Sequence, residues 1–500
     1  MIATERSDRS MKTPVIAWLE ALPAVDRDAL GRDYARAAFE AGAVVRTADG
    51  GDIPIPPLLT PEPISRAHRA LMERDAHALV KALSRLTRFV LGPDGEPLRA
   101  QLFRAFGPLE TEGLATFHEA ERLATARVDY LVDIDGNHRA LEVNATIPAM
   151  QGYSDAIAEA FLRVVGSARG LAPAAIAQLL DDNGRNTDDL LASLRAHFRR
   201  LGGRSETPSI VIVARAGDAQ LGELRHYANR FSELGHPTTI AIPADLHFDR
   251  DGRLTTDGKP IDLIYRHVFA RRLDPASDFA RACLAPARHF ILNPLASHLE
   301  VKGMLGWLSP AATDEGDAIA TRIGLSDSER DSIRRALPWT RVLSHGATRG
   351  PANEPIADLA VEVANDDSRF VLKRSWDYGG RSVFLGGDHD DRAAARAGDV
   401  MEAGRPLGWQ ELVRAAVDDP RDAWVVQERV IFRPRPHLIA GENTTTRRDL
   451  YVDCSIYTNL GADEARPSGG ASRAAPGKIV NILGGGGLAP LLLDEVIARL

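Results

Sequence analysis

The sequence predicts a mixed α/β (α+β) protein in which a parallel βαβ module is inserted between two larger regions. Apolar residues recur every three or four positions from Pro61 to Leu91, which is the period of a helix. Between Val128 and Asn144, two runs rich in Val, Leu and Tyr flank a DGN turn, which indicates a β-hairpin. From Ser209 to Ile242, two short apolar runs enclose a helical stretch with short joins, the pattern of a parallel βαβ unit.

The remaining elements divide the chain into three predicted regions. Helical spacing from Ser154 to Gly166 and from Leu171 to Leu201 places a helical region and the first part of a core within residues 1–204. The run DLIYRHVF, from Asp262 to Phe269, extends the βαβ unit into a module of residues 205–295. Residues 296–500 are predicted to complete the core with helices between 297 and 337 and four apolar runs, Arg369–Ser375, Ser382–Gly386, Ala423–Ile431 and Asp449–Thr458.

Composition and charge exclude several classes of protein. The 500 residues carry 61 Lys plus Arg against 69 Asp plus Glu, a net charge of −8, whereas a general nucleic-acid binder carries a basic face. The two cysteines, Cys283 and Cys454, have no CxxC or Cys/His spacing, so a disulfide framework and a zinc site are not expected. No stretch reaches the roughly 18 apolar residues of a membrane span, and no signal peptide is expected. These features predict a cytoplasmic protein.

The first motif that could carry chemistry is LEVN, from Leu141 to Asn144. In a strand, Glu142 and Asn144 point to the same face because they are two residues apart. A carboxylate beside a carboxamide is a pair of hard oxygen ligands suited to Mg²⁺. The alternative is an edge strand whose polar face is simply solvated.

The second motif is VLKRSWDYGGRSVFLG, in which Lys373 closes an apolar strand and Asp377 precedes Gly379 and Gly380. Glycines leave room for backbone N–H groups to approach phosphate oxygens, while a Lys supplies charge and an Asp can hold a metal. The glycines do not open a helix, so this is neither a Walker A loop nor a dinucleotide fingerprint. An ordinary hairpin remains the alternative.

Two further segments place polar groups among apolar ones. VVQERV interrupts an apolar strand with Gln427, Glu428 and Arg429. The C-terminal part offers charged and amide side chains among glycines, of which the Arg473 fork is suited to a carboxylate or phosphate. Taken singly, each of these residues is better explained as a solvated loop charge. The C-terminal set is Asp449, Asp453, Arg473, Lys478 and Asn481.

Taken in order, these motifs resemble the ATP-grasp superfamily, in the circularly permuted arrangement of eukaryotic-type glutathione synthetase. The resemblance covers residues 127–491 and is carried by five segments in the family's order. They are ARVDYLVDIDGNHRALEVNA, TTDGKPIDLIYRH, FVLKRSWDYGGRSVFLG, VVQERV and GGASRAAPGKIVNILGGGG.

The resemblance implies roles for particular residues. The implied metal ligands are Glu142, Asn144 and Asp377. The implied ATP-binding residues are Lys302, Lys373, Gly379, Gly380, Gln427, Glu428, Arg429, Val430 and Asp449, with adenine on the backbone of the segment from Gln427 to Val430. The implied substrate arginines are Arg127, Arg266 and Arg473, and of the set Arg127, Arg473 and Lys373 are implied to be catalytic.

The chain departs from the family at several positions. Residues 146–151, TIPAMQ, replace a small Ser-rich segment, and Ala475 replaces a second basic residue. At the Gly-rich flap, the family's usual polar and glycine residues are replaced by Arg374, Ser375, Trp376 and Tyr378. Nucleotide chemistry is therefore expected, but glutathione as the product is in doubt. The glycine-rich loops from Gly379 to Ser382 and from Gly461 to Gly477 are expected to close over the site.

The resulting hypothesis is an ADP-forming carbon-nitrogen ligase that uses ATP and Mg²⁺ to join a small carboxylic acid to an amine through an acylphosphate. Two alternatives stay open: a phosphotransferase on the same fold, and a non-catalytic nucleotide-binding protein. The expected partners are small molecules, with no nucleic acid and no membrane, and the family would favour a homodimer. From the inserted module, Gln220 and Glu223 are candidates to face the site.

Overall fold

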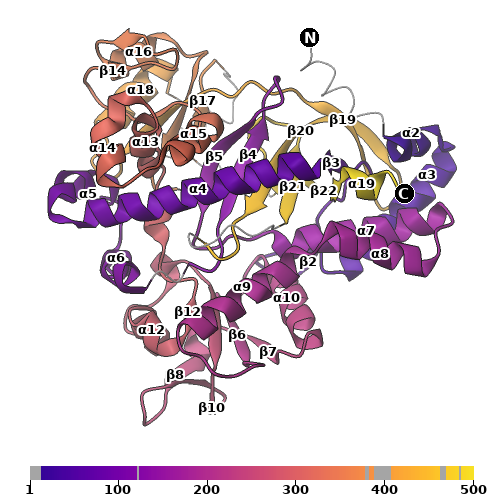
Figure 1. Ribbon diagram of the computed structural model, residues 1–500. Helices are drawn as coiled ribbons and strands as arrows, with labels where there is room; N and C mark the ends of the chain where they lie inside the picture. Colours follow the sequence, from indigo (N-terminus) through magenta and orange to yellow (C-terminus); the bar gives the residue numbers. More distant parts are fainter. Residues whose placement is uncertain (1–12, 121–122, 378–381, 388–406, 462–468, 483–485) are drawn as a thin grey trace.

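The structure is a computed structural model, and it describes residues 13–120, 123–377, 382–387, 407–461, 469–482 and 486–500. Three sheets organise the chain (Figure 1). We call them the large sheet, the parallel sheet and the small sheet. They correspond to the mixed α/β fold that the sequence predicts.

The large sheet is antiparallel and joins distant parts of the chain. Its order is β22-β21-β20-β4-β5, with β19 paired to β20. The predicted hairpin is confirmed as β4 and β5, but its neighbour β20 comes from the C-terminal third. The strands are β4 (Arg127–Val132), β5 (His138–Asn144), β19 (Arg435–Ile439), β20 (Thr446–Tyr457), β21 (Gly470–Ala475) and β22 (Gly487–Ala489).

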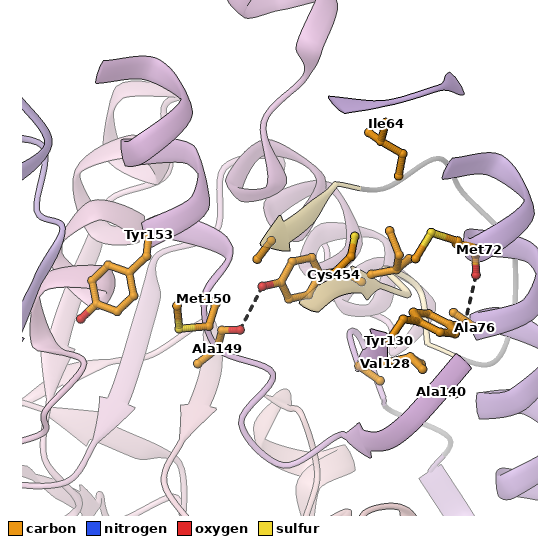
Figure 2. Close-up of a cluster of buried hydrophobic side chains, with 14 of the residues drawn as sticks. Ile64, Met72, Ala76, Val128, Tyr130, Ala140, Ala149, Met150, Tyr153 and Cys454 are labelled. Carbon is orange, nitrogen blue, oxygen red and sulfur yellow. Dashed lines mark hydrogen bonds between the residues drawn. The ribbon is translucent and has the colours of Figure 1, made fainter. Parts of the chain in front are cut away.

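Helix α4 (Arg66–Leu91) crosses one face of the large sheet (Figure 1). The side chain of Ser65 caps its N-terminus by accepting from the His68 N–H at 3.1 Å. Its apolar stripe packs on the sheet, and the Tyr130 hydroxyl of β4 donates to the Met72 carbonyl at 3.3 Å (Figure 2). Because this face forms the main core, the polar residues that alternate with it along β4 and β5 lie on the opposite face.

The parallel sheet has the order β12-β11-β6-β7 and confirms the predicted βαβ unit. Its residues lie within 210–292, inside the predicted module of 205–295. Helix α10 (Leu221–Glu233) connects β6 to β7, and α9 (Asn186–Arg200) packs nearby. The strands are β6 (Ile210–Ala214), β7 (Thr238–Ala241), β11 (Leu263–His267) and β12 (Ile291–Leu292).

The small sheet is antiparallel, with the order β13-β18-β16-β17. One of its faces packs on α16 (Leu359–Asn365) and α18 (Trp409–Val417) through a cluster that includes Leu372 and Trp424. Lys373 and Gln427 alternate with these residues and therefore lie on the other face. The strands are β13 (Thr340–Val342), β16 (Phe370–Arg374), β17 (Val383–Leu385) and β18 (Trp424–Glu428).

Shorter elements and further helices complete the described chain. Strand β23 pairs in parallel with β3, so the C-terminal segment pairs with a strand of the N-terminal region. The N-terminal elements are α2 (Pro14–Ala21), α3 (Ala24–Glu40), β1 (Val44–Arg46), β2 (Asp52–Pro54), β3 (Glu62–Ile64), α5 (Glu96–Leu102), α6 (Pro108–Ala120), α7 (Gln151–Ala168) and α8 (Pro173–Asn183). The later ones are β8 (Leu246–Phe248), β9 (Leu254–Thr256), β10 (Lys259–Pro260), α11 (Asp278–Cys283), α12 (Pro286–His289), α13 (Lys302–Ala311), α14 (Asp317–Arg322), α15 (Asp327–Ala336), β14 (Thr348–Arg349), β15 (Pro355–Ile356), β23 (Leu491–Leu493) and α19 (Asp494–Ile497).

Among the described residues, no helix combines the length and the apolar character needed to cross a membrane.

Candidate active site between the two antiparallel sheets

Two buried lysines join the large sheet to the small sheet. Lys302, the first residue of α13, places its Nζ 3.3 Å from Glu142 Oε2 on β5 and donates to the Asp377 carbonyl at 2.7 Å. Lys373, on β16, donates to the Leu141 carbonyl of β5 at 3.1 Å and to Gln427 Oε1 of β18 at 2.7 Å. Four residues that the sequence singles out, Lys302, Lys373, Glu142 and Asp377, therefore meet between the two sheets.

The electrostatics of this site favour an anionic ligand. Burial lowers the pKa of Lys373 to about 8, and the nearby Lys302 charge contributes to that shift, while Glu142 opposes it. Both side chains are at most 6% exposed, so the two ammonium groups are compensated chiefly by Glu142 and by neutral carbonyl and amide oxygens. A phosphate placed between them would supply further negative charge.

The predicted metal ligands present oxygens that suit Mg²⁺. Glu142 and Asn144 follow one another on the polar face of β5, opposite the face covered by α4. Asn144 Nδ2 donates to Asp129 at 3.3 Å, which leaves its Oδ1 for another partner. Asp377 accepts from the Ser382 hydroxyl at 2.5 Å. Carboxylate and amide oxygens are the ligands that Mg²⁺ takes, so the donor set fits the ion.

Asp129 is the centre of a charge network that the sequence analysis missed. It is 1% exposed and accepts hydrogen bonds from side chains on four strands: Arg127 at 2.6 and 3.0 Å, Asn144 at 3.3 Å, Ser455 at 2.8 Å and Arg473 at 3.0 Å. Although burial acts to raise it, the two guanidinium charges hold the pKa of Asp129 well below its usual range.

The spacing of Asp129 from Arg127 in the sequence could have identified it as a site residue. Arg127 and Asp129 are two residues apart in a buried strand, so they share the face that also carries Glu142 and Asn144. Asp453, on β20, is directly opposite Arg473 on β21 and holds its guanidinium, with 3.0 Å between Arg473 Nε and Asp453 Oδ2. The guanidinium groups of Arg127 and Arg473 thus already form ion pairs with carboxylates of this chain, Asp129 and Asp453.

Arg266 occupies a different environment from the other two predicted substrate arginines. It is fully buried at the end of the parallel sheet, and its guanidinium donates to four main-chain carbonyls. The donor–acceptor distances are 2.9 Å to Asn293, 2.5 Å to Pro294 and 3.4 Å to Thr146, and Val268 is the fourth acceptor. In this conformation Arg266 ties β11 to the segment after β5, and a role in substrate binding stays a prediction.

The predicted adenine segment follows the end of β18. The main-chain N–H groups of Glu428 and Arg429 donate to the carbonyls of Trp339 and Arg369, both at 2.8 Å, and Val430 is half-buried. Asp449 is exposed on β20 and, four residues from Asp453, shares its face of the strand. The nucleotide roles of Gln427, Glu428, Arg429, Val430 and Asp449 stay predictions.

Part of the predicted site lies outside the described residues. Gly379 and Gly380 fall there, as do residues 378–381 and 462–468 of the two loops expected to close over the site. From the inserted module, Glu223 is buried in the first turn of α10 and accepts from the Gly152 N–H at 3.1 Å, while Gln220 precedes that helix. The module therefore contacts the segment that follows Asn144.

Comparison with known proteins adds evidence on the fold. No protein-family model matches the chain, and no curated protein matches it in sequence. A solved structure of a glutathione synthetase-like effector from Globodera pallida, in its apo form, matches with a TM-score of 0.59 and 14% identity, over 94% of this chain and 98% of that one. The fold is glutathione-synthetase-like.

A second solved structure is named as a gamma-glutamylcysteine synthetase, provisionally assigned, from Methylobacillus flagellatus. It matches with a TM-score of 0.38 and 11% identity over 85% of this chain and 94% of that one, which is too low for a conclusion about fold. Within the glutathione-synthetase-like fold, this chain itself shows the contacts of Lys302 with Glu142 and the Asp377 carbonyl, and of Lys373 with the Leu141 carbonyl.

Proposed function

We propose that the protein is an ATP- and Mg²⁺-dependent carboxylate-amine ligase with a circularly permuted ATP-grasp core. The observation that carries the proposal is the convergence of two buried lysines from separate elements on Glu142, the Asp377 carbonyl and the edge of the large sheet. A site of this kind attracts a polyphosphate and excludes much of the surrounding water, which strengthens each charge interaction inside it.

Each group has a distinct part in the proposed reaction. Lys302 and Lys373 bind the phosphate oxygens of ATP, and the segment 427–430 contacts adenine. Glu142, Asn144 and Asp377 would hold Mg²⁺, which would neutralise charge on the phosphates. Arg127 and Arg473 contribute positive potential next to the acid, even though Asp129 and Asp453 offset part of it.

The chemistry needs no covalent bond to the protein. A carboxylate oxygen of the acid substrate attacks the γ-phosphorus of ATP, which gives an acylphosphate and ADP. The amine then attacks the carbonyl carbon, and inorganic phosphate leaves as the amide forms. The protein's contribution is to orient the three reactants and to stabilise the charge that moves between them.

The test is ATP turnover with Mg²⁺ and hydroxylamine over a panel of amino acids and short peptides. Hydroxylamine intercepts an acylphosphate as a hydroxamate, so the acid is identified before the amine is known. We expect hydroxamate with at least one acid and its loss in Lys373→Met. Release of ADP with a stable phosphorylated product and no hydroxamate would replace the ligase with a phosphotransferase, and binding of ATP without either product would favour a nucleotide-binding protein.

A further inference from the structure

A cavity lies outside the two-sheet site, at the edge of the small sheet formed by β13. Its volume is about 230 Å³. It is enclosed by the residues that follow β13, by the end of α18 with the segment leading to β18, and by Gln101 and Arg104 near α5. Trp424 lines it from the face of the small sheet that packs on α18, opposite the face that carries Lys373.

Asp422 lines this cavity, and one of its carboxylate oxygens has no hydrogen-bond partner among the described residues. Asp422 is 2% exposed, and its Oδ2 accepts from the main-chain N–H of Trp376 at 2.6 Å. Its Oδ1 is buried and has no hydrogen-bond partner among the described residues, and Arg374 Nε lies 3.9 Å from Oδ2. Arg374 Nε is also buried and, in the described part of the chain, without a hydrogen-bond partner, but it is beyond hydrogen-bond distance of Oδ2. Because a buried charged acceptor without a hydrogen bond is destabilising, Oδ1 favours an additional donor.

The other residues that line the cavity suit a ligand that carries such a donor. Arg104 is exposed and donates through Nη1 to the Asp419 carbonyl at 3.0 Å, and a guanidinium has further N–H groups that can bind a second acceptor. Gln101 and Ser344 add neutral polar groups, and Trp424 adds an apolar wall. The volume is below the usual range of roughly 300–1,000 Å³ for drug-sized ligand sites, so the occupant has about the size of an amino acid.

The cavity wall also holds the segment that carries the nucleotide site. Asp422 fixes the main chain at Trp376, and the Ala423 carbonyl accepts from the Ser375 N–H at 2.9 Å. The carbonyl of Ser375 in turn accepts from the Lys302 N–H at 3.0 Å, and the carbonyl of Asp377 accepts from Lys302 Nζ. A ligand that binds Asp422 therefore contacts a side chain whose main-chain partner, Trp376, lies next to the two carbonyls that Lys302 contacts.

We propose that this cavity binds a small zwitterionic amine of the amino-acid class, with its ammonium group on Asp422 and its carboxylate towards Arg104, and that its occupancy is coupled to nucleotide binding. The coupling rests on the proposed function, whereas the cavity and its ligand class do not. Such a site would let the concentration of an amino acid adjust the affinity of the enzyme for ATP.

The experiment is a titration of the full-length protein with glycine, methylammonium and acetate, followed by calorimetry or saturation-transfer NMR. We expect glycine to saturate one site more tightly than either single-charge probe. Asp422→Asn keeps an acceptor for Trp376 but replaces the free oxygen with a donor, so glycine binding should weaken at least tenfold. The exposed Asp418, four residues away and outside the lining, provides the matched control Asp418→Asn, which should bind as the wild type does.

Arg104→Gln tests the other end of the cavity without disturbing a buried group. It should weaken glycine binding and leave methylammonium binding unchanged. Because an amino acid could also bind as a substrate between the sheets, dependence on Asp422 and Arg104 decides which site is measured. Absence of saturable binding, or binding unaffected by Asp422→Asn, would mean that water satisfies the free oxygen and would overturn the site.

The coupling is measured separately, as the change in ATP affinity when glycine is saturating. Linkage requires ATP to change glycine affinity by the same factor, and a coupling of about fivefold or more is within the usual range. If ATP does not bind at all, the proposed function fails while the glycine titration still decides the cavity. If both ligands bind without affecting each other, the coupling is wrong and the site alone remains.

Discussion

Replacing Asp129 with Asn should lower the free energy of unfolding more than the small change in side-chain volume suggests. The substitution preserves shape but removes the negative charge that pairs with Arg127 and Arg473 and receives the Asn144 and Ser455 donors. Breaking a buried ion pair by removing one partner costs about 3–5 kcal/mol, because the other charge stays buried. Arg473 retains Asp453, so the lower end of that range, about 3 kcal/mol, is the expected loss.

The matched control is Asp75→Asn, on the other side of the same hairpin. Asp75 is a fully buried residue of α4, and it accepts from Arg335 Nε at 2.9 Å and contacts His138 Nε2 at 2.7 Å. Because the Arg335 side chain is 39% exposed, its charge can return to water in the variant. The expected cost is therefore smaller, about 1–3 kcal/mol.

Two assays separate the variants. Urea unfolding at pH 7 should show a loss for both, larger for Asp129→Asn. Since the pKa of Asp129 is depressed in the folded state, its stabilisation is complete above the unfolded pKa of about 3.9 and declines as the pH falls towards the folded value. The difference between wild type and Asp129→Asn should thus be smaller at pH 3 than at pH 7.

The second assay is Mn²⁺ binding followed by electron paramagnetic resonance in the presence of ATP. Asp129 holds Nδ2 of Asn144, so the Asp129→Asn variant should lose the fixed orientation of the Asn144 oxygen and bind Mn²⁺ about tenfold more weakly. Asp75→Asn should bind Mn²⁺ normally. Equal Mn²⁺ affinity in the wild type and both variants would refute the positioning role that we assign to Asp129.

Three further expectations concern other buried groups. The folded state favours neutral Lys373, whose pKa is about 8, so the stability of the wild type should rise between about pH 8 and pH 10 and that of Lys373→Met should not; urea midpoints measure this. Burial raises the pKa of Glu223 to about 7, so stability should fall as the pH rises from about 4.5 to 7, and Glu223→Gln should be more stable than the wild type at pH 8 by up to about 3 kcal/mol in thermal and urea unfolding. Arg266→Met should fail to fold stably because four carbonyls lose their donor; a stable variant that loses affinity only for the acid would restore Arg266 as a substrate residue.

Local pattern was enough to predict the elements that depend on neighbours in sequence. The period of α4, the hairpin of β4 and β5, and the parallel pairing of β6 with β7 all follow from spacing and short turns. The pairing of β20 with β4 could not be derived in this way, because the two strands are separated by roughly 300 residues and nothing local specifies the partner.

The residues of the candidate site divide in the same way, into those that the sequence predicts and those that depend on contacts between distant segments. Lys373 and Glu142 were predicted from charged residues in apolar strands, Lys302 was implied by the family resemblance, and the structure places the three close together. That Asp129 gathers four strands, and that Arg266 gives its donors to carbonyls, depends on contacts between residues distant in the chain. Sequence pattern identifies which side chains carry charge, whereas the packed fold decides which charges are already satisfied.

The position of β20 in the large sheet also constrains how the chain is made. Strands β4 and β5 leave the ribosome early, but their neighbour begins at Thr446. At typical synthesis rates, the roughly 300 residues between them take about 15–60 s to appear, and during that time one edge of the hairpin has no strand to pair with. A nascent chain of this protein should therefore engage chaperones until β20 has emerged, and slowing translation should lower the yield of folded protein.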